Sequence, residues 1–508
     1  MIFISDEYDD MFEEWELVVT NMNTNTNMQG QSSVDGCIEP LDSLGVNDAE
    51  PPRNEQDSWL PITESRKGNT STVAFHLICS GIGVQPLLLP VAFSYLGWSG
   101  GILCLSVVFW WQLYTIWLLL NLHESASGIR YSRFLHLSTV AFGNKLGKLV
   151  AIFPTMYLST GTCVLYIISG GNIMDQLHHA LCGDDQLECE AKALKLSEWF
   201  LVFICSATLT ALFFTNLNKL YRVSLIGSVT AVAYCSLLWV LSVSKGQLAH
   251  VSGDYSTMEV KPTDTGDRIQ NVLNGIGIIA LAFRGHNLVL EIQGTLPTSP
   301  TQPSRKPMWR GVTISYLLIA MCMYPLAMVG HWAYGSKVIV DGGILGAFTK
   351  FHQNHTSKYI TGAIYFIILI NYLCAFQIYA MPVFDKFEHI YTSKKNQPCP
   401  RWLRSAIKVS FGGLTYFVAM AFPFLPSLGA LLGSIALPLT LVYPCFMWVA
   451  IKKPLPLSKM WCLNISVGSL GVVLSLMLFS AALSSLIVNG LDANFFKPRA
   501  FSLCQLIN

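Results

Sequence analysis

The chain has 508 residues, of which 52% are hydrophobic and only 12% are charged, and its mean hydropathy is +0.45. Soluble domains contain about 25% charged residues. The composition therefore excludes an ordinary soluble protein and indicates an integral membrane protein. The net charge of +1 gives no indication of a nucleic-acid partner, because a sum close to zero identifies no basic surface.

The N-terminal segment differs from the rest of the chain in its charge. Residues 1–64 hold 15 of the 31 acidic residues and a single basic residue, Arg53. A segment of this composition cannot bury enough apolar surface to fold alone, so it predicts a disordered acidic cytosolic tail. The rest divides into a transmembrane domain, residues 65–492, and a short C-terminal tail, residues 493–508.

Eleven apolar segments between residues 65 and 492 are long enough to cross a bilayer. They predict an all-α integral membrane protein with eleven transmembrane helices. The segments lie at about 70–94, 98–121, 146–171, 197–215, 221–243, 269–293, 311–334, 357–382, 405–426, 428–450 and 461–489.

The distribution of Lys and Arg predicts which connections face the cytosol. Residues 383–408 contain six basic residues, and the positive-inside rule places this connection in the cytosol. The N-terminus is then cytosolic and the C-terminus extracellular, with the plasma membrane as the expected location. In this orientation Cys182 and Cys189 lie outside, either as a short disulfide loop or as two free thiols, and Asn354 is a candidate glycosylation site.

Two of the expected spans contain residues that interrupt a helix. The first contains Gly81-Ile82-Gly83 followed by Pro86, and glycine and proline cost about 1 and 3 kcal/mol in a helix interior. Five spans later, the sixth span contains Gly275-Ile276-Gly277 and then Arg284-Gly285. Interrupted spans at matching positions of two five-span halves are typical of inverted-repeat transporters, whose substrates bind at the breaks. The eleventh span is then an extra C-terminal helix.

Several motifs accompany these breaks. They are Trp59-Leu60-Pro61-Ile62-Thr63 and Ala74-Phe75-His76 before the first break, Leu122-His123-Glu124 after the second span, Phe153-Pro154-Thr155-Met156-Tyr157-Leu158-Ser159 in the third, and Gly285-His286-Asn287 with Leu290-Glu291-Ile292-Gln293 in the sixth. Together they resemble the plant amino acid/auxin permease family over about residues 59–490, and its lysine/histidine transporter-like subgroup in particular. The resemblance implies a leucine-transporter-like fold and proton-coupled uptake of amino acids, with the proton gradient as driving force and no cofactor.

An amino-acid headgroup needs an anion site beside a cation site. Backbone amides around the first break suit the carboxylate, and freed carbonyls at the second break suit the ammonium group. Close packing of helices at the glycines is the alternative, and polar residues in mid-span can instead bridge two helices. The predicted substrate-binding residues are Gly81, Ile82, Gly83, Gln85, Ala280, Leu281, Phe283, Arg284, Tyr157, Ser159 and Asn371.

Arg284 is the most unusual residue of the sixth span. An arginine in mid-span costs about 2.5–3.5 kcal/mol on insertion scales, and such residues commonly mark function. The guanidinium could pair with Glu291 or with the carboxylate of a bound substrate. It could also stand in for a coupling cation, or form a structural ion pair near the cytosolic end of the span.

The candidates for proton coupling are His76, His286 and Glu291. Histidine titrates near neutral pH, and a desolvated carboxylate gives up its proton less readily than an exposed one. The alternative for both histidines is a structural role in the core, with each ring hydrogen-bonded to a neighbouring span.

The leading hypothesis is a secondary active transporter that imports neutral or cationic amino acids, such as lysine or histidine, together with protons. The alternatives are a carrier of auxin-like or acidic carboxylates, an organellar amino-acid exporter, and a non-transporting nutrient receptor that signals through the acidic tail. An enzyme is not expected, because the sequence contains no metal-binding His/Glu helix, no activated-serine elbow and no phosphate loop.

Overall fold

The computed structural model describes residues 55–125, 128–182, 194–214, 216–246, 265–283, 285–299, 302–340, 343–352, 356–423, 429–489 and 495–496. Cys189, Arg284 and Asn354 lie outside this set, as do residues 1–54 and nearly all of the expected C-terminal tail. The interpretations of those residues therefore stay predictions.

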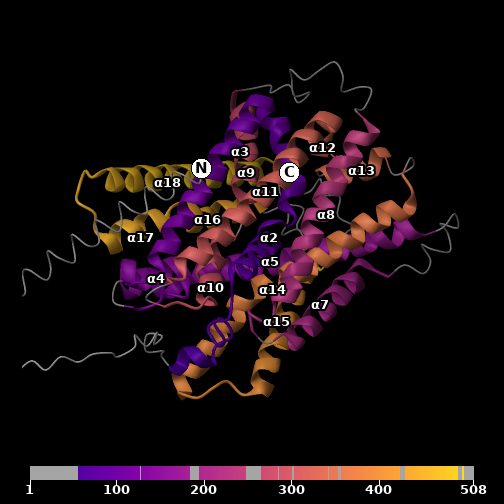
Figure 1. The fold of residues 1–508 in the computed structure, drawn as a ribbon. Helices are drawn as coiled ribbons and strands as arrows, with labels where there is room; N and C mark the ends of the chain where they lie inside the picture. The colour runs from indigo at the N-terminus through magenta and orange to yellow at the C-terminus, as the bar shows by residue number, and fades with distance from the viewer. Residues whose placement is uncertain are drawn as a thin grey trace, which may run out of the picture. The chain divides into compact units, whose positions relative to one another are not determined.

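Every regular element in the described part of the chain is helical, and the one extended pairing there is an isolated bridge between Glu124 and Arg130. This confirms the all-α prediction. Nine helical segments of the described residues are long and apolar enough to cross a membrane. In chain order the elements are η1 (Glu55–Trp59), α2 (Thr70–Gly81), η2 (Gln85–Leu88), α3 (Leu89–Leu122), α4 (Phe134–Phe142), α5 (Asn144–Leu181), α7 (Leu196–Phe213), α8 (Tyr221–Lys245), α9 (Thr265–Ala282), α10 (His286–Gly294), α11 (Arg305–Tyr334), α12 (Lys337–Val340), α13 (Ile344–His352), α14 (Lys358–Lys395), α15 (Arg401–Ala421), α16 (Gly429–Leu441), α17 (Tyr443–Lys452) and α18 (Lys459–Asn489) (Figure 1).

A sharp turn, and no loop, separates the first two expected spans. η2 leads directly into α3, and within α3 the chain turns at Gly97, whose φ of +70° glycine adopts without strain. This turn lies between residues 94 and 98, where the sequence places the boundary. α3 therefore contains the last part of the first expected span and the whole of the second.

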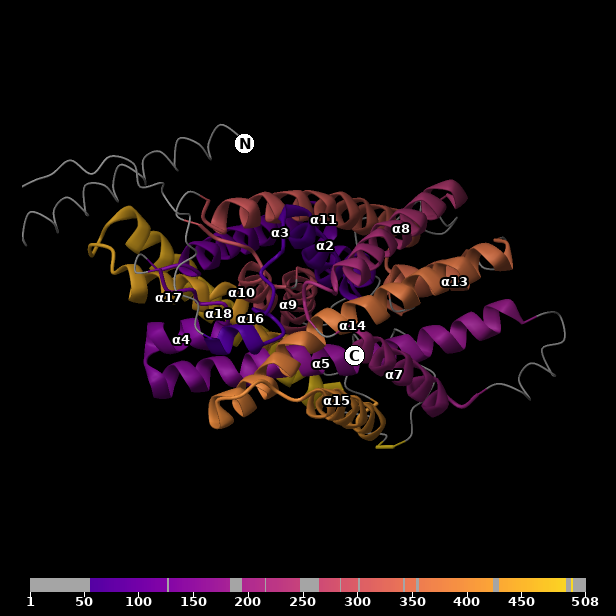
Figure 2. The ribbon, with the colours of Figure 1, turned by 60° about the horizontal axis from the view of Figure 1, so that its bottom comes forward.

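α5 and α14 are much longer than the apolar layer of a bilayer. Each has 38 residues, or about 57 Å at 1.5 Å per residue, against a hydrocarbon core of about 30 Å. Their ends must therefore project beyond the apolar layer. α14 packs against α2, α5, α7, α8 and α15. In Figure 2, α9 and α10 lie between α3 and α11 on one side and α5 and α14 on the other.

The residues just before α2 pack onto the helices. Leu60 and Ile62 are fully buried. The Pro61 carbonyl accepts a hydrogen bond from the Leu217 N–H at 3.2 Å, and the Trp59 carbonyl accepts one from Arg404 at 2.7 Å. The sequence placed residues 1–64 in the tail, but residues 55–64 belong to the packed part of the chain. Leu60 and Ile62 are the apolar side chains that hold this segment in place. The mostly acidic and polar composition of residues 1–64 gave no sign of them.

Gly227 sets the distance at which α8 approaches its neighbours. A Cβ atom on Gly227 would lie 2.2 Å from the Cys79 sulfur on α2 and 2.7 Å from Cys374 Cβ on α14. We expect Gly227→Ala to destabilise the protein by about 1–3 kcal/mol through overpacking, measured as a lower apparent melting temperature in detergent. Gly413→Ala is the matched control, because a Cβ there meets nothing within 4 Å. Equal melting temperatures of the two variants would contradict this packing.

Candidate functional site

The chain leaves the helical conformation at the first predicted break. α2 ends at Gly81, Ile82 is extended at φ −106° and ψ 104°, and helical structure resumes at η2. Two tyrosines satisfy carbonyl oxygens freed there: the Tyr379 hydroxyl donates to Ser80 at 2.9 Å, and the Tyr234 hydroxyl donates to Gly83 at 2.7 Å. An unpaired backbone group costs several kcal/mol in a bilayer, so these bonds stabilise the break. The prediction of a break is confirmed.

The amides at this break differ in their availability to a ligand. Gly81 is still part of α2, and the Ile82 N–H donates to the Ile78 carbonyl at 3.0 Å. The Gly83 N–H, in contrast, has no acceptor among the described residues. A Cβ atom on Gly83 would lie 2.6 Å from the Tyr166 hydroxyl oxygen. Of the three predicted amides, that of Gly83 is therefore the one open to an anion.

The second predicted break is also confirmed. α9 ends at Ala282 and α10 begins at His286, with Gly285 left-handed at φ +119°. A Cβ atom on Gly285 would lie 3.7 Å from the Ser80 hydroxyl oxygen. Since Ser80 lies one residue before the end of α2, the two breaks are in direct contact. The first turn of α10 places its positive dipole end at this junction.

The predicted residues before the second break have partners of their own. The Ala280 carbonyl accepts a long hydrogen bond, 3.4 Å, from Gln112 Nε2 on α3. Leu281 faces α16, because a Cβ atom on Gly433 would lie 2.2 Å from its side chain. Phe283 is buried, and its ring packs edge-on against Phe109 with the centroids 5.7 Å apart. The ring therefore packs between the end of α9 and α3.

A cavity of about 890 Å³ leads to the same region. It is lined by one face of α5 and one face of α14, and by residues of α4, α10 and the segment before α2. Its inner end is formed by Ser159, Asn287 and Glu291, and Asn287 donates to the Ser159 hydroxyl at 3.2 Å. Glu291 is only 7% exposed, and its Oε2 has no hydrogen-bond partner within the described residues. The cavity thus ends at a buried carboxylate with an unused oxygen.

Comparison with known proteins decides the family. Residues 66–485 match the family described as transmembrane amino acid transporter protein. The chain belongs to this family. Two Arabidopsis thaliana proteins are each 46% identical to it: lysine histidine transporter-like 8, over 88% of this chain and 84% of the relative, and lysine histidine transporter-like 7, over 87% and 90%. A solved structure of a Na⁺-coupled sialic acid symporter is 10% identical, with a TM-score of 0.49, over 85% of this chain and 93% of that one.

These matches confirm the resemblance to the lysine/histidine transporter-like subgroup. The protein is an integral membrane transporter of amino acids, and it is not an enzyme.

The two histidines of the transporter are held by hydroxyl groups of other helices. His76 Nδ1 lies 2.6 Å from the Ser224 hydroxyl on α8, and His286 Nε2 lies 2.8 Å from the Thr115 hydroxyl on α3. Both rings are fully buried, and the second nitrogen of each has no partner among the described residues. These contacts fit the structural role that the sequence left open, and each ring retains one unused nitrogen.

The remaining predicted residues lie in different surroundings. Gln85 begins η2 and is partly exposed, and Tyr157 is half-buried on α5. Asn371 donates to the Gly227 carbonyl at 2.9 Å and so joins α14 to α8, which is the bridging role. Cys182 is disulfide-bonded; its predicted partner, Cys189, lies outside the described residues.

Tyr372 is a candidate pocket-wall residue by sequence, but the sequence does not single out the other tyrosines at the first break, Tyr166, Tyr234 and Tyr379. Tyr166, Tyr372 and Tyr379 lie together, with ring centroids 5.3 Å apart for Tyr166 and Tyr372 and 6.2 Å apart for Tyr166 and Tyr379. The available signal was a tyrosine hydroxyl in mid-span, which requires a polar partner. That signal does not name the partner, because Tyr379 and Ser80 are separated by 299 residues.

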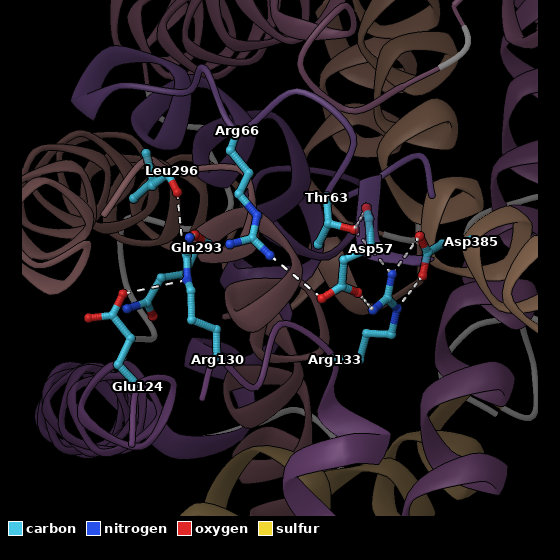
Figure 3. A network of polar contacts seen from close by, with 9 residues as sticks. All are labelled: Asp57, Thr63, Arg66, Glu124, Arg130, Arg133, Gln293, Leu296 and Asp385. Atoms are coloured by element: carbon cyan, nitrogen blue, oxygen red, sulfur yellow. Dashed lines mark hydrogen bonds and ion pairs between the residues drawn. The ribbon is translucent and has the colours of Figure 1, made fainter. Parts of the chain in front are cut away.

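A network of charged side chains joins the segment before α2 to the transmembrane helices (Figure 3). Arg133 is at its centre, with Nε donating to Asp385 Oδ2 at 2.7 Å and Nη1 donating to Asp57 Oδ1 at 3.1 Å. Arg66 lies 3.7 Å from the other oxygen of Asp57. The Ile62 N–H donates to Asp385 at 3.3 Å. The network fixes this segment to the α3–α4 connection and to α14.

A second arginine in Figure 3 caps the end of α10. Arg130 Nη2 donates to the carbonyls of Leu296 at 2.9 Å and Gln293 at 3.3 Å. Its Nε lies 3.6 Å from Glu124, which accepts from the Ser304 hydroxyl at 2.6 Å. A cation is favourable at a helix C-terminus, so Arg130 stabilises the end of α10. Through Glu124 it also connects α10, the second half of the broken sixth span, to the end of α3.

The close approach at Gly83 gives a test of the first break. We expect Gly83→Ala to reduce amino-acid uptake, because its Cβ would collide with the Tyr166 hydroxyl oxygen. Tyr166→Phe removes that oxygen, and the next nearest atom would be 3.5 Å away. The double variant should therefore recover most of the uptake measured with labelled amino acid in proteoliposomes. A double variant no better than Gly83→Ala would show that the collision is not the cause.

The Arg133 network predicts a rescue of a different kind. Arg133→Gln leaves Asp385, whose side chain is 3% exposed, as a buried charge without a cation, at a cost of about 3 kcal/mol. We expect a lower melting temperature in detergent, and a partial recovery in Arg133→Gln/Asp385→Asn, which removes the stranded charge. Arg222→Gln, at an exposed position of α8, is the control. A double variant less stable than Arg133→Gln would contradict the pairing.

Proposed function

We propose that this transporter is a proton symporter that imports neutral or cationic amino acids across the plasma membrane. The observation that carries the proposal is the contact between the two breaks beside a cavity that ends at Glu291. The names of the relatives point to lysine and histidine as the substrates to test first.

The substrate would bind at the junction of the breaks. Its carboxylate would accept from the Gly83 N–H, which has no acceptor among the described residues, with Gly81, Ile82 and Gln85 around it. Its ammonium group would donate to carbonyls near the end of α9, where the Ala280 carbonyl accepts a long hydrogen bond from Gln112. Tyr157, Ser159, Leu281, Phe283, Arg284 and Asn371 complete the proposed set.

We propose eleven spans in a five-plus-five arrangement with one extra helix. Two spans would be added to the nine long apolar segments. One is the first span, made of α2, η2 and the beginning of α3. The second is α15, whose first turns carry Arg401, Arg404 and Lys408. Alternating access would then proceed by movement around the two broken spans.

The disulfide supports a cytosolic N-terminus and an extracellular C-terminus. Cys182 follows the end of α5 and is oxidised, and disulfides persist outside the reducing cytosol. In this proposal the end of α5 would lie outside and its beginning, near residue 144, in the cytosol. The cavity would then open to the cytosol, where a substrate is released.

Glu291 is the proposed proton carrier, and His76 and His286 are secondary candidates. A carboxylate that loads and unloads a proton must reach water in one state, and Glu291 lines the cavity while one of its oxygens is unused. The histidines already share a nitrogen with a hydroxyl of another helix and do not line the cavity.

The test is uptake of labelled amino acids by proteoliposomes with and without an inward proton gradient. We expect accumulation above equilibrium to require the gradient in the wild type and to be lost in Glu291→Gln, which cannot release a proton. Exchange of internal for external substrate should persist, because it needs no net proton movement.

Glu198→Gln, at an exposed position at the start of α7, is the matched control and should behave like the wild type. Accumulation by the wild type without a proton gradient, or gradient-driven accumulation by Glu291→Gln, would refute this coupling. Uptake of auxin-like or acidic carboxylates in preference to lysine and histidine would refute the substrate class.

A further inference from the structure

The outer part of the cavity is a cleft between two long helices. On α5 the cavity is lined by Asn144, Lys148 and Ile152, and on α14 by Lys386, Ile390 and Lys394. Residues four apart share one face of a helix, so each helix presents a continuous strip to the other. From Asn144 to Ser159 the strip on α5 covers about 22 Å. In Figure 2 the beginning of α5 lies beside the C-terminal part of α14. We name Lys148, Ile152, Lys386, Ile390 and Lys394 the lysine cleft.

The charges of the lysine cleft are not balanced by acids. The cavity is lined by six Lys and Arg residues but only three acidic residues. Two of the acids, Asp57 and Asp385, are bound by Arg133, and the third, Glu291, is at the inner end.

Among the described residues, the three lysines of the cleft form no ion pair with an acid. Burial lowers the pKa of His136, and the adjacent Arg133 lowers it further, so this imidazole adds no charge at pH 7. The excess positive charge therefore comes from the lysines, one on α5 and two on α14, none of which forms an ion pair with an acid of the described residues.

Apolar side chains flank the same lysines on the outer surface. Leu149 on α5 is 74% exposed and Phe387 on α14 is 46% exposed. Ile152 and Ile390 line the cavity and are also 39% and 40% exposed. Leu149 and Ile152 lie within the expected third span, so their exposed side chains face lipid, whereas Phe387 and Ile390 lie beyond the expected end of the eighth span at residue 382, toward the cytosol. The cleft is therefore open sideways, toward the acyl chains, as well as toward the aqueous phase.

We propose that the lysine cleft binds the phosphate headgroup of an anionic phospholipid of the cytosolic leaflet. The phosphate would lie between Lys148 and Lys386, and the acyl chains would run inward along Leu149 and Ile152 on α5. Basic pockets between transmembrane helices on the cytosolic side suit such headgroups. A soluble anion would use the lysines but leave the flanking apolar residues without a role, which favours the lipid.

A bound headgroup would lie at the mouth of the cavity that ends at Glu291. It would therefore neutralise the lysines and narrow the route between the junction of the breaks and the cytosol. The composition of the cytosolic leaflet would then affect the rate of transport. This inference depends on the proposed orientation of the chain but not on the choice of substrate or on proton coupling.

The binding test uses the purified full-length transporter and three probes: dioctanoyl phosphatidylinositol 4-phosphate, its deacylated headgroup, and inorganic phosphate. Binding is measured as the concentration dependence of the melting temperature. We expect the lipid to stabilise the wild type at concentrations at least tenfold lower than the two soluble probes. Lys148→Gln/Lys386→Gln should weaken lipid binding at least tenfold, since each basic residue contributes measurably to headgroup affinity.

The matched control is Lys145→Gln/Lys395→Gln, which removes one lysine from each of the same helices at positions that do not line the cavity. This variant should bind the lipid like the wild type. Leu149→Ser/Ile152→Ser should weaken binding of the lipid but leave that of the headgroup unchanged, and it keeps the proposal testable if the lysine variant is unstable.

Two results would overturn the proposal. Equal losses in the cavity-lining and control lysine variants would show general attraction to surface charge. Equal potency of inorganic phosphate or the headgroup and the lipid would show a site for a soluble anion.

A separate readout is uptake in liposomes of phosphatidylcholine with and without the anionic lipid. Uptake by the wild type and by the control variant should change alike when the anionic lipid is added, and uptake by the Lys148→Gln/Lys386→Gln variant should not change. Loss of proton coupling in all variants would bear on the proposed function and leave the lipid site unaffected.

Discussion

The structure depends on how the chain satisfies backbone groups where two helices stop inside the apolar layer. A spanning helix pairs its own amides and carbonyls, and a break removes that pairing where water is scarce. Here tyrosine hydroxyls from α8 and α14 donate to the carbonyls of Gly83 and Ser80. The partners come from other helices, so the broken span can exist only within the assembled bundle. The proposed binding site rests on the same fact, because a backbone group without an internal partner is available to a ligand.

Ion pairs tie the segment before α2 to the helices. Arg133 bonds both Asp57 and Asp385, so one guanidinium links the chain before the first span to the long helix α14. Arg130 does the same for the end of α10. α2 is the first half of the first broken span, and α10 is the second half of the sixth. The two arginines therefore hold the elements that would move in the proposed alternating-access cycle.

The cavity connects these features in space. Its inner end is formed by Ser159, Asn287 and Glu291, its wall includes the Arg133 network, and its mouth is the lysine cleft. A path of this kind would let a proton or a released amino acid travel between the junction of the breaks and the aqueous phase. The sequence suggests Arg284 as the partner of Glu291, and Arg284 lies outside the described residues.

The sequence by itself determined the features that depend on local composition. Apolar length identified the spans, Gly81-Ile82-Gly83 and Gly285 identified the two breaks, and the motifs around them identified the family. Only the tertiary structure decided which side chains complete the site, because hydrogen bonds such as Tyr379 to Ser80 and ion pairs such as Arg133 to Asp385 join residues far apart in the chain. Residues 55–64 show the same limit: their average composition is acidic and polar, yet two apolar side chains find a buried place that exists only after the helices have packed.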